Sequence, residues 1–307
     1  MQPSSLSSFL QLSPEVQQAR NERQPIVALE STVISHGLPY PQNLELAREL
    51  ESIVRENGAV PATVALADGR VRIGLDDALL ERLATESGII KVSLRDMGLL
   101  LAEETVLGAT TVAGTMWAAH AAGIQVFATG GIGGVHPGEG DDISADLPAL
   151  ATIPLCVVSS GAKAILDLPR TREWLETWGV PILGLRTKQL PAFYSADSGL
   201  LVDRAVQDEG EAARYVAAHL ALGRSGILLT APVPEKDALP KETVLGWITA
   251  AQRAAEAEGV QGYALTPFLL SFLAERSEGQ TLRANLALLR NNAAVAARLS
   301  YSLSNRR

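Results

Sequence analysis

Residues 111–128 read TVAGTMWAAHAAGIQVFA and combine a helical stretch with a short strand. Thr111 is a residue type that commonly precedes a helix, and Gly123 is a residue type that commonly ends one. The next five residues, Ile124–Ala128, are mostly apolar and include β-branched and aromatic side chains, which favours a strand. A helix that leads directly into a strand is the repeating unit of a parallel sheet.

The same unit recurs along most of the chain. The predicted strands are Ile26–Leu29, Val60–Leu66, Val71–Ile73, Ile89–Val92, Ile124–Ala128, Leu155–Ser159, Pro181–Leu185 and Ile227–Thr230. The predicted helices are Pro41–Asn57, Asp77–Glu86, Thr111–Ala122, Ala162–Leu168, Thr171–Trp178 and Ala205–Leu222. Several strands are continuous apolar runs, which indicates that both of their faces are buried. The alternation predicts a single α/β domain with a largely parallel central sheet.

The two ends of the chain differ from this pattern. Residues 1–24 are polar and rich in Ser and Gln, which predicts an N-terminal arm, either loose or helical, before a domain at 25–307. The last third is mostly helical. Its final segment carries an apolar stripe of Leu282, Leu286, Leu289, Ala293, Ala296 and Leu299. Asn285 and Asn292 are seven residues apart, so both are expected on one side, at the margin of that stripe.

The net charge limits the class of partner. The 307 residues include 26 Lys and Arg and 34 Asp and Glu, which gives a formal charge of −8. Nucleic-acid-binding proteins usually carry a basic patch, so this acidic chain is not expected to bind nucleic acid as its main partner. A small anionic ligand stays open.

Cysteine content and hydropathy bear on the compartment. The single cysteine, Cys156, cannot form an internal disulfide and leaves no cysteine-based zinc site. The N-terminus lacks the basic start and apolar run of a secretory signal, and no stretch reaches the ~18–20 apolar residues of a membrane span. The sequence therefore predicts a cytoplasmic protein without a membrane partner.

Two charged residues stand at predicted strand ends, where ligands gather in open α/β sheets. Glu30 directly follows Ile26–Leu29, and a partly desolvated carboxylate there suits acid–base chemistry. Helix capping or an ion pair is the alternative role. Lys91 lies inside the apolar segment IIKV, where burial of an ammonium group is costly unless the group is paired. A lysine that reaches solvent from a sheet edge is the alternative there.

Lys163 follows the predicted strand Leu155–Ser159 and is expected in the first turn of the helix Ala162–Leu168. The helix dipole and desolvation would both disfavour the charged amine, and a neutral lysine can form a Schiff base with a sugar aldehyde. Repulsion from a nearby Lys91 would act in the same direction. An ordinary exposed lysine is the alternative.

Two further segments have the chemistry of a ligand site. Thr110 and Thr111 are expected at a helix start, where free amides and hydroxyls form a phosphate site or where a threonine simply caps the helix. Residues 128–147, ATGGIGGVHPGEGDDISADL, match neither the dinucleotide fingerprint nor the P-loop. This segment is either a solvated acidic loop or a source of donors for Mg²⁺ or Mn²⁺. The candidate donors are His136, Glu139, Asp141, Asp142 and Asp146.

Taken together, the motifs closely resemble those of the pseudouridine-5′-phosphate glycosidases, also called the indigoidine synthase A-like family. The resemblance spans about residues 25–300 and rests on LESTVISHGLPYPQN, VPATVA, GATTVAGTM, FATGGIGGVH, DISADL, VVSSGAKAILD and ANLALLRNNA. It implies a three-layer α/β/α fold, a homotrimer, and dependence on Mn²⁺, with Mg²⁺ as the second candidate metal.

The implied reaction is reversible cleavage of the C–C glycosidic bond of pseudouridine 5′-phosphate to uracil and ribose 5-phosphate, through a lysine Schiff base with the opened ribose. By resemblance, Glu30 matches the proton donor, Lys163 the nucleophile and Asp142 the metal ligand. The substrate-binding positions implied in the same way are Lys91, Val112, Ser144, Ala145 and Asp146, with His136 and Asn285 as further active-site positions. A C-glycoside has no heteroatom leaving group to protonate, so a Lys–Glu pair suits it better than two carboxylates.

One segment departs from the family pattern. Members commonly carry Arg after the histidine of GGVH and Phe before DISADL, whereas this chain has Pro137 and Asp141 there, joined by a short loop. These differences bear on metal and phosphate contacts rather than on Glu30 and Lys163. A lysine-dependent aldolase and a phosphosugar-binding protein without enzymatic activity are the alternative functions.

Overall fold

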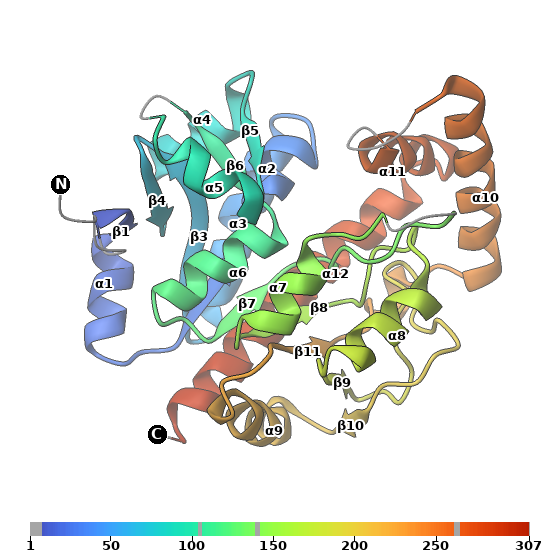
Figure 1. The fold of residues 1–307 in the computed structure, drawn as a ribbon. Coiled ribbons are helices and arrows are strands. Elements are labelled where there is room, and N and C mark those ends of the chain that lie inside the picture. The colour runs from blue at the N-terminus through green and yellow to red at the C-terminus, as the bar shows by residue number, and fades with distance from the viewer. Residues whose placement is uncertain (1–7, 104–105, 139–141, 261–264, 307) are drawn as a thin grey trace.

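The structure is a computed structural model that describes residues 8–103, 106–138, 142–260 and 265–306. One mixed sheet crosses the molecule, in the order β1-β4-β3-β2-β7-β8-β11-β9-β10, with β6 paired to β3 and β5 to β6. Helices cover both faces of the sheet (Figure 1), so the predicted three-layer α/β/α architecture is confirmed.

The parallel half of the sheet supplies the buried centre. It runs through β2 (Ile26–Leu29), β7 (Val126–Ala128), β8 (Cys156–Ser159), β11 (Ile227–Thr230), β9 (Ile182–Leu185) and β10 (Arg204–Val206), and every neighbouring pair is parallel. All residues of β7, β8, β9 and β11 are buried. Burial on both faces explains why these segments are continuous apolar runs in the sequence.

The other half of the sheet reverses direction. The long strand β3 (Val60–Ala67) pairs in parallel with β2 through residues 60–63 and then extends past the end of β2. Its extension pairs antiparallel with β6 (Gly108–Thr110), and β5 (Ile90–Val92) joins β6 in parallel. Strands β5 and β6 therefore approach the carboxyl end of β2 from the opposite side. The outer strands are β4 (Arg70–Ile73), antiparallel to β3, and β1 (Leu10–Leu12), parallel to β4.

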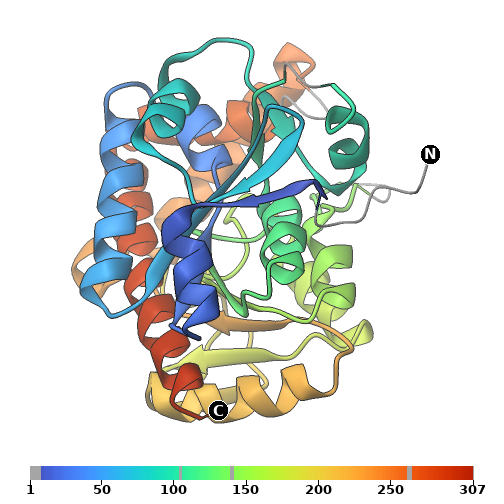
Figure 2. The ribbon, with the colours of Figure 1, turned by 90° about the vertical axis from the view of Figure 1, so that its left-hand side faces the viewer.

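The two helical layers are separated in Figure 2, with the sheet between them. One layer contains α6 (Val112–Ala121), α7 (Asp146–Thr152) and α8 (Leu168–Thr177). The other contains α3 (Gln42–Glu56) and the long α12 (Gln280–Ser304), against which α9 (Glu209–Ala221) packs. The remaining helices are α1 (Pro14–Asn21), α2 (Thr32–His36), α4 (Asp77–Thr85), α5 (Leu94–Leu100), α10 (Lys241–Glu258), α11 (Leu265–Arg276) and the short 3₁₀ helix η2 (Glu235–Asp237).

All eight predicted strands are present, with ends that differ by at most two residues from the prediction. The strands that the sequence did not indicate, β1, β6 and β10, have three residues each, which is too few to establish an alternating or apolar pattern. The first residues of the predicted helix Ala205–Leu222 belong to β10, because the side chain of Asp208 caps the helix only from Glu209 onward.

The predicted helix Ala162–Leu168 is wrong. Residues 161–167 form bends and a turn, and helix α8 begins at Leu168 with the Asp167 side chain as its cap. Gly161 has φ +83°, a left-handed conformation that stops a helix from starting there, and Pro169 is confined to the first turn of α8.

The N-terminal segment combines a short strand with a short helix. Val16 and Ala19 of α1 are fully buried, and Arg55 of α3 forms an ion pair with Glu15 at 3.0 Å. The predicted boundary between residues 24 and 25 stays a prediction. None of the helices in the described ranges is both long and apolar enough to cross a membrane.

Candidate active site

The carboxyl ends of the strands surround a cleft made of two adjoining cavities, of about 340 Å³ and 640 Å³. Six residues line both cavities: Glu30, Thr32, Lys91, Ser93, Thr111 and Lys163. They come from segments that the reversal of β5 and β6 brings face to face with β2, β7 and β8. The cleft therefore unites the two halves of the sheet.

Hydrogen bonds connect the two halves of the sheet beside the cleft. Ser31, directly after Glu30, donates from Oγ to the carbonyl of Val64 at 2.6 Å and accepts from the amide of Thr110 at 2.9 Å. The hydroxyl of Thr32 donates to the Thr110 carbonyl at 2.7 Å. These buried contacts fix the end of β2 against the end of β6, so Glu30 has a defined place in the cleft.

Glu30 lines both cavities, and most of the surroundings of its carboxyl group are protein rather than solvent. Burial raises the pKa of Glu30 above its ordinary value of 4.5, and the charge of Lys163 and a hydrogen bond from the Thr129 hydroxyl lower it by less. The raised pKa extends the pH range over which this carboxyl carries a proton, as a general acid requires. Glu30 directly follows the end of β2, as predicted, and its role as the proton donor stays a prediction.

Lys163 lies in the irregular segment after β8. Its amide donates to the carbonyl of Ile132 at 3.0 Å, and its neighbour Ala162 forms an isolated bridge with Ile132. The amine reaches the cleft from this loop, so the expected contribution of a helix dipole is absent. Lys163 still lies close enough to Glu30 for its charge to lower the pKa of that carboxyl.

Lys91 approaches the same cleft from β5. Burial lowers the pKa of Lys91 below 10.5, and the charge of Lys163 lowers it further, while Glu30 and Asp146 act in the opposite direction. The two lysines and two carboxyl groups therefore form one interacting set. The positive charge of the two lysines is therefore opposed within the cleft by two acidic groups.

Asp146 holds two parts of the site together. Its Oδ1 accepts from the amide of Ala113 at 3.0 Å, at the start of α6, and its Oδ2 accepts from the amide of Gly133 at 2.7 Å. Its own amide donates to the hydroxyl of Ser144 at 3.3 Å. A Cβ on Gly133 would lie 2.8 Å from Oδ2 of Asp146, so only glycine allows this approach.

The start of α6 lies against the smaller cavity. Thr111 caps the helix by accepting from the amide of Gly114 at 3.4 Å, and both Thr111 and Val112 line the cavity. The first turn of a helix attracts anions through its amides and dipole. Thr110 differs from the prediction in its placement, since it is the last residue of β6, fully buried, and its hydroxyl donates to Val64 and pairs with Thr115.

Apart from Leu166, the remaining residues of the smaller cavity come from the glycine-rich loop: Gly133, His136, Asp142, Ser144, Ala145 and Asp146. The His136 amide donates to the carbonyl of Asp142 at 2.9 Å, which closes this loop on itself. Glu139 and Asp141, two of the predicted donors, lie outside the described residues. Pro137 is exposed.

The described part of the glycine-rich loop offers two candidate ligands for a divalent metal ion. Within the described ranges, no three His, Cys, Asp or Glu side chains are arranged to hold a metal. Asp142 is exposed on the cavity, and Nδ1 of His136 is buried without a hydrogen-bond partner among the described residues. An exposed carboxylate fits an ion that completes its coordination with water and substrate oxygens, as Mg²⁺ commonly does, whereas an imidazole nitrogen is a ligand for transition metals.

Asn285 lines the larger cavity, and its place in the active site stays a prediction. Phe193, Leu270 and Leu289 line the same cavity. Phe193 has φ +60°, and its ring packs within 2.6 Å of where a Cβ on Gly131 would lie. The sequence pattern did not indicate Thr32, Ser93, Thr129 or Phe193 as cleft residues, because single hydroxyls and one aromatic residue in loops carry no periodic signal.

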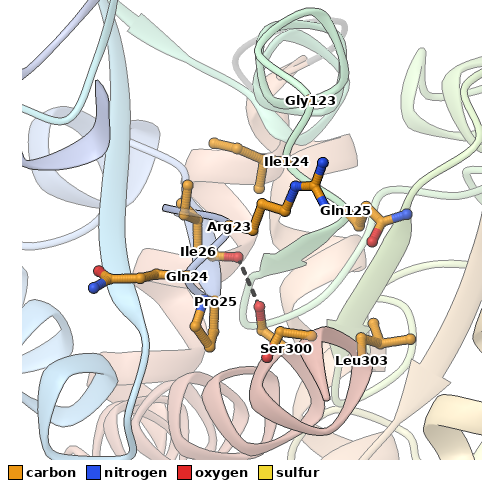
Figure 3. Close-up of a pocket in the computed structure, with 10 residues that line it drawn as sticks. Arg23, Gln24, Pro25, Ile26, Gly123, Ile124, Gln125, Ser300 and Leu303 are labelled. Carbon is orange, nitrogen blue, oxygen red and sulfur yellow. Dashed lines mark hydrogen bonds between the residues drawn. The ribbon is translucent and has the colours of Figure 1, made fainter. Parts of the chain in front are cut away.

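A second pocket lies at the opposite, amino end of β2 and β7 and is shown in Figure 3. It measures about 50 Å³ and is lined by Arg23, Gln125 and Ser300, among others. The Ser300 hydroxyl donates to the carbonyl of Ile26 at 3.0 Å. This pocket contains no carboxylate or lysine, so it does not compete with the cleft as a catalytic site.

A sequence model of the family described as indigoidine synthase A like protein matches residues 15–302. The chain belongs to the indigoidine synthase A-like family. The predicted resemblance is therefore confirmed over nearly the whole chain.

Relatives with more than half of their residues identical are named pseudouridine-5′-phosphate glycosidase. The protein of Caldanaerobacter subterraneus subsp. tengcongensis is 52% identical over 302 residues, which cover 97% of this chain and 98% of that protein. The protein of Herpetosiphon aurantiacus is 54% identical over 295 residues, which cover 95% of this chain and 97% of that protein. These names are those of an enzyme, which confirms the prediction of an enzyme over that of a non-enzymatic binding protein.

Two solved structures share the fold. The prealnumycin C-glycosynthase AlnA, in complex with ribulose 5-phosphate, has a TM-score of 0.90 and 44% identity, covering 97% of this chain and 98% of that one. An indigoidine synthase A-like protein from Thermotoga maritima has a TM-score of 0.88 and 32% identity, covering 99% of each chain. The three-layer fold is thus common to the family.

Proposed function

We propose that this chain reversibly cleaves the C–C glycosidic bond of pseudouridine 5′-phosphate, giving uracil and ribose 5-phosphate. The observation that carries the proposal is the pairing of Glu30 and Lys163 in one cleft, close enough for the lysine to alter the pKa of the carboxyl. The names of the relatives support the same substrate, and the sugar phosphate held by AlnA supports a sugar-phosphate ligand.

The proposed reaction runs through an imine on Lys163. Glu30 gives its proton to the ring oxygen O4′, and the C1′–O4′ bond breaks while the uracil ring supplies electrons and loses its N1 proton to water. The unprotonated Nζ of Lys163 then adds to C1′. Protonation of uracil C5 lets the C1′–C5 bond break with its electrons passing into the uracil ring, whose N1 regains a proton from water. Uracil leaves, and water hydrolyses the remaining imine to ribose 5-phosphate and free lysine.

The shape of the cleft supports a division of the substrate between the two cavities. The smaller one, with Lys91, Ser144 and the first turn of α6, has the cationic and amide donors that suit the ribose 5-phosphate part. The larger one has an apolar wall of Phe193 and Leu289 together with polar side chains that include Asn285, Arg95 and Asp96, and this combination suits a flat polar base. Glu30 and Lys163 line both cavities, at the expected place of the C1′–C5 bond.

A divalent metal is part of the proposal. Asp142 and Nδ1 of His136 would hold Mn²⁺, or Mg²⁺ as the second candidate, and the ion would supply positive charge beside the substrate phosphate when bound. The chain's own contribution is to hold this loop closed through the contact between His136 and Asp142. The homotrimer and the cytoplasmic location stay predictions.

Reductive trapping tests the proposal. Purified protein is incubated with ribose 5-phosphate and borohydride, and the modified residue is located by peptide mass mapping. An adduct on Lys163, absent in Lys163→Ala and retained in Lys91→Ala, is the expected result, together with uracil release from pseudouridine 5′-phosphate. Uracil release without any trapped lysine would refute the imine, and an adduct without uracil release would favour a lysine-dependent aldolase.

A further inference from the structure

A buried polar cluster lies beneath the cleft, and its two central side chains, those of Asn292 and Ser160, do not line the cleft. Its centre is Asn292 of α12, which is fully buried. The side-chain amide Nδ2 donates to the carbonyl of Thr129 at 2.9 Å and to the hydroxyl of Ser160 at 3.2 Å. The Ser160 hydroxyl in turn donates to the carbonyl of Ala231 at 2.8 Å.

The partners of this cluster follow different strands of the parallel sheet. Thr129 is the first residue after β7, Ser160 the first after β8, and Ala231 the first after β11. The carbonyl of Ser160 also accepts from the amide of Phe193 at 3.0 Å, in the segment that follows β9. One asparagine and one serine therefore tie four strand-end segments to each other and to α12.

Two of these segments carry the groups proposed for catalysis. Thr129, held by Asn292 at its carbonyl, donates from its hydroxyl to Oε1 of Glu30. Lys163 stands three residues after Ser160, beyond Gly161, whose left-handed conformation sets the direction of the loop. A displacement of Asn292 would therefore change the relative position of the acid and the nucleophile.

The absence of a side chain at Gly130 allows α12 to pack close to the segment that follows β7. A Cβ on Gly130 would lie 3.2 Å from Leu288 and 3.2 Å from Leu289 of α12. The buried side-chain amide of Asn292 also supplies the Thr129 carbonyl with a hydrogen-bond donor. A buried carbonyl without a donor would lower the stability of the fold. Aspartate could not replace Asn292, since its carboxylate would face the carbonyl oxygen of Thr129.

We propose that Asn292 is a positioning residue for the reaction: it sets the geometry between Glu30 and Lys163 without touching substrate. The inference rests on the proposed function, because it concerns the two residues assigned to that chemistry. A misplacement of about 1 Å at reacting groups lowers rates by about 100-fold. Loss of the Asn292 amide is therefore expected to lower kcat far more than it changes the KM for the phosphorylated substrate.

The test compares three variants. Asn292→Ala and Ser160→Ala are expected to lower kcat for uracil release by at least about 10-fold, to leave KM within about 3-fold, and to slow borohydride trapping at Lys163 in parallel. The double variant should lose no more than the more damaged single variant, because both residues belong to one hydrogen-bonded chain. Ser160→Ala removes one hydroxyl and keeps the proposal testable where Asn292→Ala fails to fold.

The matched control is Ser300→Ala. Ser300 is a buried hydroxyl of the same helix, and it donates to Ile26 at the amino end of β2 (Figure 3). Its loss should lower Tm while kcat stays at the wild-type value. The proposal is overturned if folded Ser160→Ala and Asn292→Ala keep the wild-type kcat, or if Ser300→Ala loses as much kcat as they do. Absence of uracil release from the wild-type protein would instead refute the proposed function, and this inference with it.

Discussion

The Thr129 hydroxyl donates a hydrogen bond to Oε1 of Glu30, which joins the first residue after β7 to the first residue after β2. The backbone of Thr129 is fixed as well, since its carbonyl accepts from Asn292. The carboxyl group is thus held by a hydroxyl and is also influenced by the charges of Lys163 and Lys91. Its burial outweighs both of these influences and keeps its pKa above the ordinary value.

Glu30→Gln should abolish uracil release and stabilise the fold at neutral pH. Because the folded state raises the pKa of Glu30 above 4.5, the stability that this group contributes is fully present below that value and is lost as pH rises through the raised pKa. Glutamine has no such loss. The Tm of the variant relative to wild type should therefore increase from about pH 4 towards neutral pH.

Thermal unfolding across this pH range measures the effect. Glu173→Gln, a change at an exposed carboxyl group of α8, is the control and should leave the Tm difference flat. A Glu30→Gln protein that is less stable than wild type at neutral pH, or that still releases uracil, would contradict the prediction.

Thr129→Val should move the pH dependence of the reaction. The hydroxyl of Thr129 lowers the pKa of Glu30, so its removal raises that pKa further. The alkaline limb of kcat/KM, where a proton donor is lost, should then shift to higher pH by roughly one unit or less, since a hydrogen bond is worth about 1 kcal/mol. A pH profile of uracil release measures the shift.

The control for this change is Thr230→Val. Thr230 is a fully buried threonine at the end of β11, and its hydroxyl donates to the carbonyl of Leu183 rather than to a carboxyl group. Its replacement should leave the alkaline limb in place. A shift of the Thr129→Val profile to lower pH would show that the hydroxyl does not stabilise the ionised form of Glu30.

For residues that directly follow parallel strands, the sequence was sufficient to predict that they meet in the cleft. Glu30 and Lys163 stand after strands that are continuous apolar runs, and the carboxyl ends of such strands lie at one edge. Lys91 is different, because it reaches the cleft only through the reversal at β6. That three-residue strand has no pattern of its own, and its pairing with β3 depends on contacts between residues more than 40 positions apart.

Local backbone chemistry explains the error at Lys163. The residues after Gly161 have helical propensity, yet the left-handed Gly161 and the bridge from Ala162 to Ile132 hold them in an irregular path. The two asparagines of α12 illustrate a second limit. Periodicity placed Asn285 and Asn292 on one side of the helix, but only the tertiary structure distinguishes the one that lines the cavity from the one that lies buried under the strand ends.

Asp142→Asn should weaken the binding of the metal ion while it leaves the catalytic groups in place. The amide keeps the size of the side chain but loses the negative charge that a divalent cation prefers. After treatment with a chelator, wild-type protein should regain uracil release with Mn²⁺ at about a tenfold lower concentration than the variant. Mn²⁺ binding followed by electron paramagnetic resonance gives a readout that is independent of turnover. Asp68→Asn, in the turn between β3 and β4, is the control and should match wild type in both measurements.

Gly133→Ala should disrupt the clamp that Asp146 forms between the glycine-rich loop and α6. An alanine Cβ at residue 133 would collide with the Ser144 hydroxyl and lie 2.8 Å from Oδ2 of Asp146, so the loop would have to move. Overpacking of this kind costs about 1–3 kcal/mol. Because Asp146 and Ser144 line the smaller cavity, the KM for pseudouridine 5′-phosphate should rise along with the loss of stability.

A glycine-to-alanine change at a position with free space serves as the control, because it should stabilise the protein where Gly133→Ala destabilises it. Gly246 lies within α10, and a Cβ there would meet nothing within 4 Å, so Gly246→Ala should stabilise the helix by up to about 1 kcal/mol and leave KM unchanged. Urea unfolding and steady-state kinetics on both variants measure the two effects. A Gly133→Ala protein with wild-type stability and KM would mean that the loop can shift without loss, and that the bond between Asp146 and Gly133 does not determine the shape of the cavity.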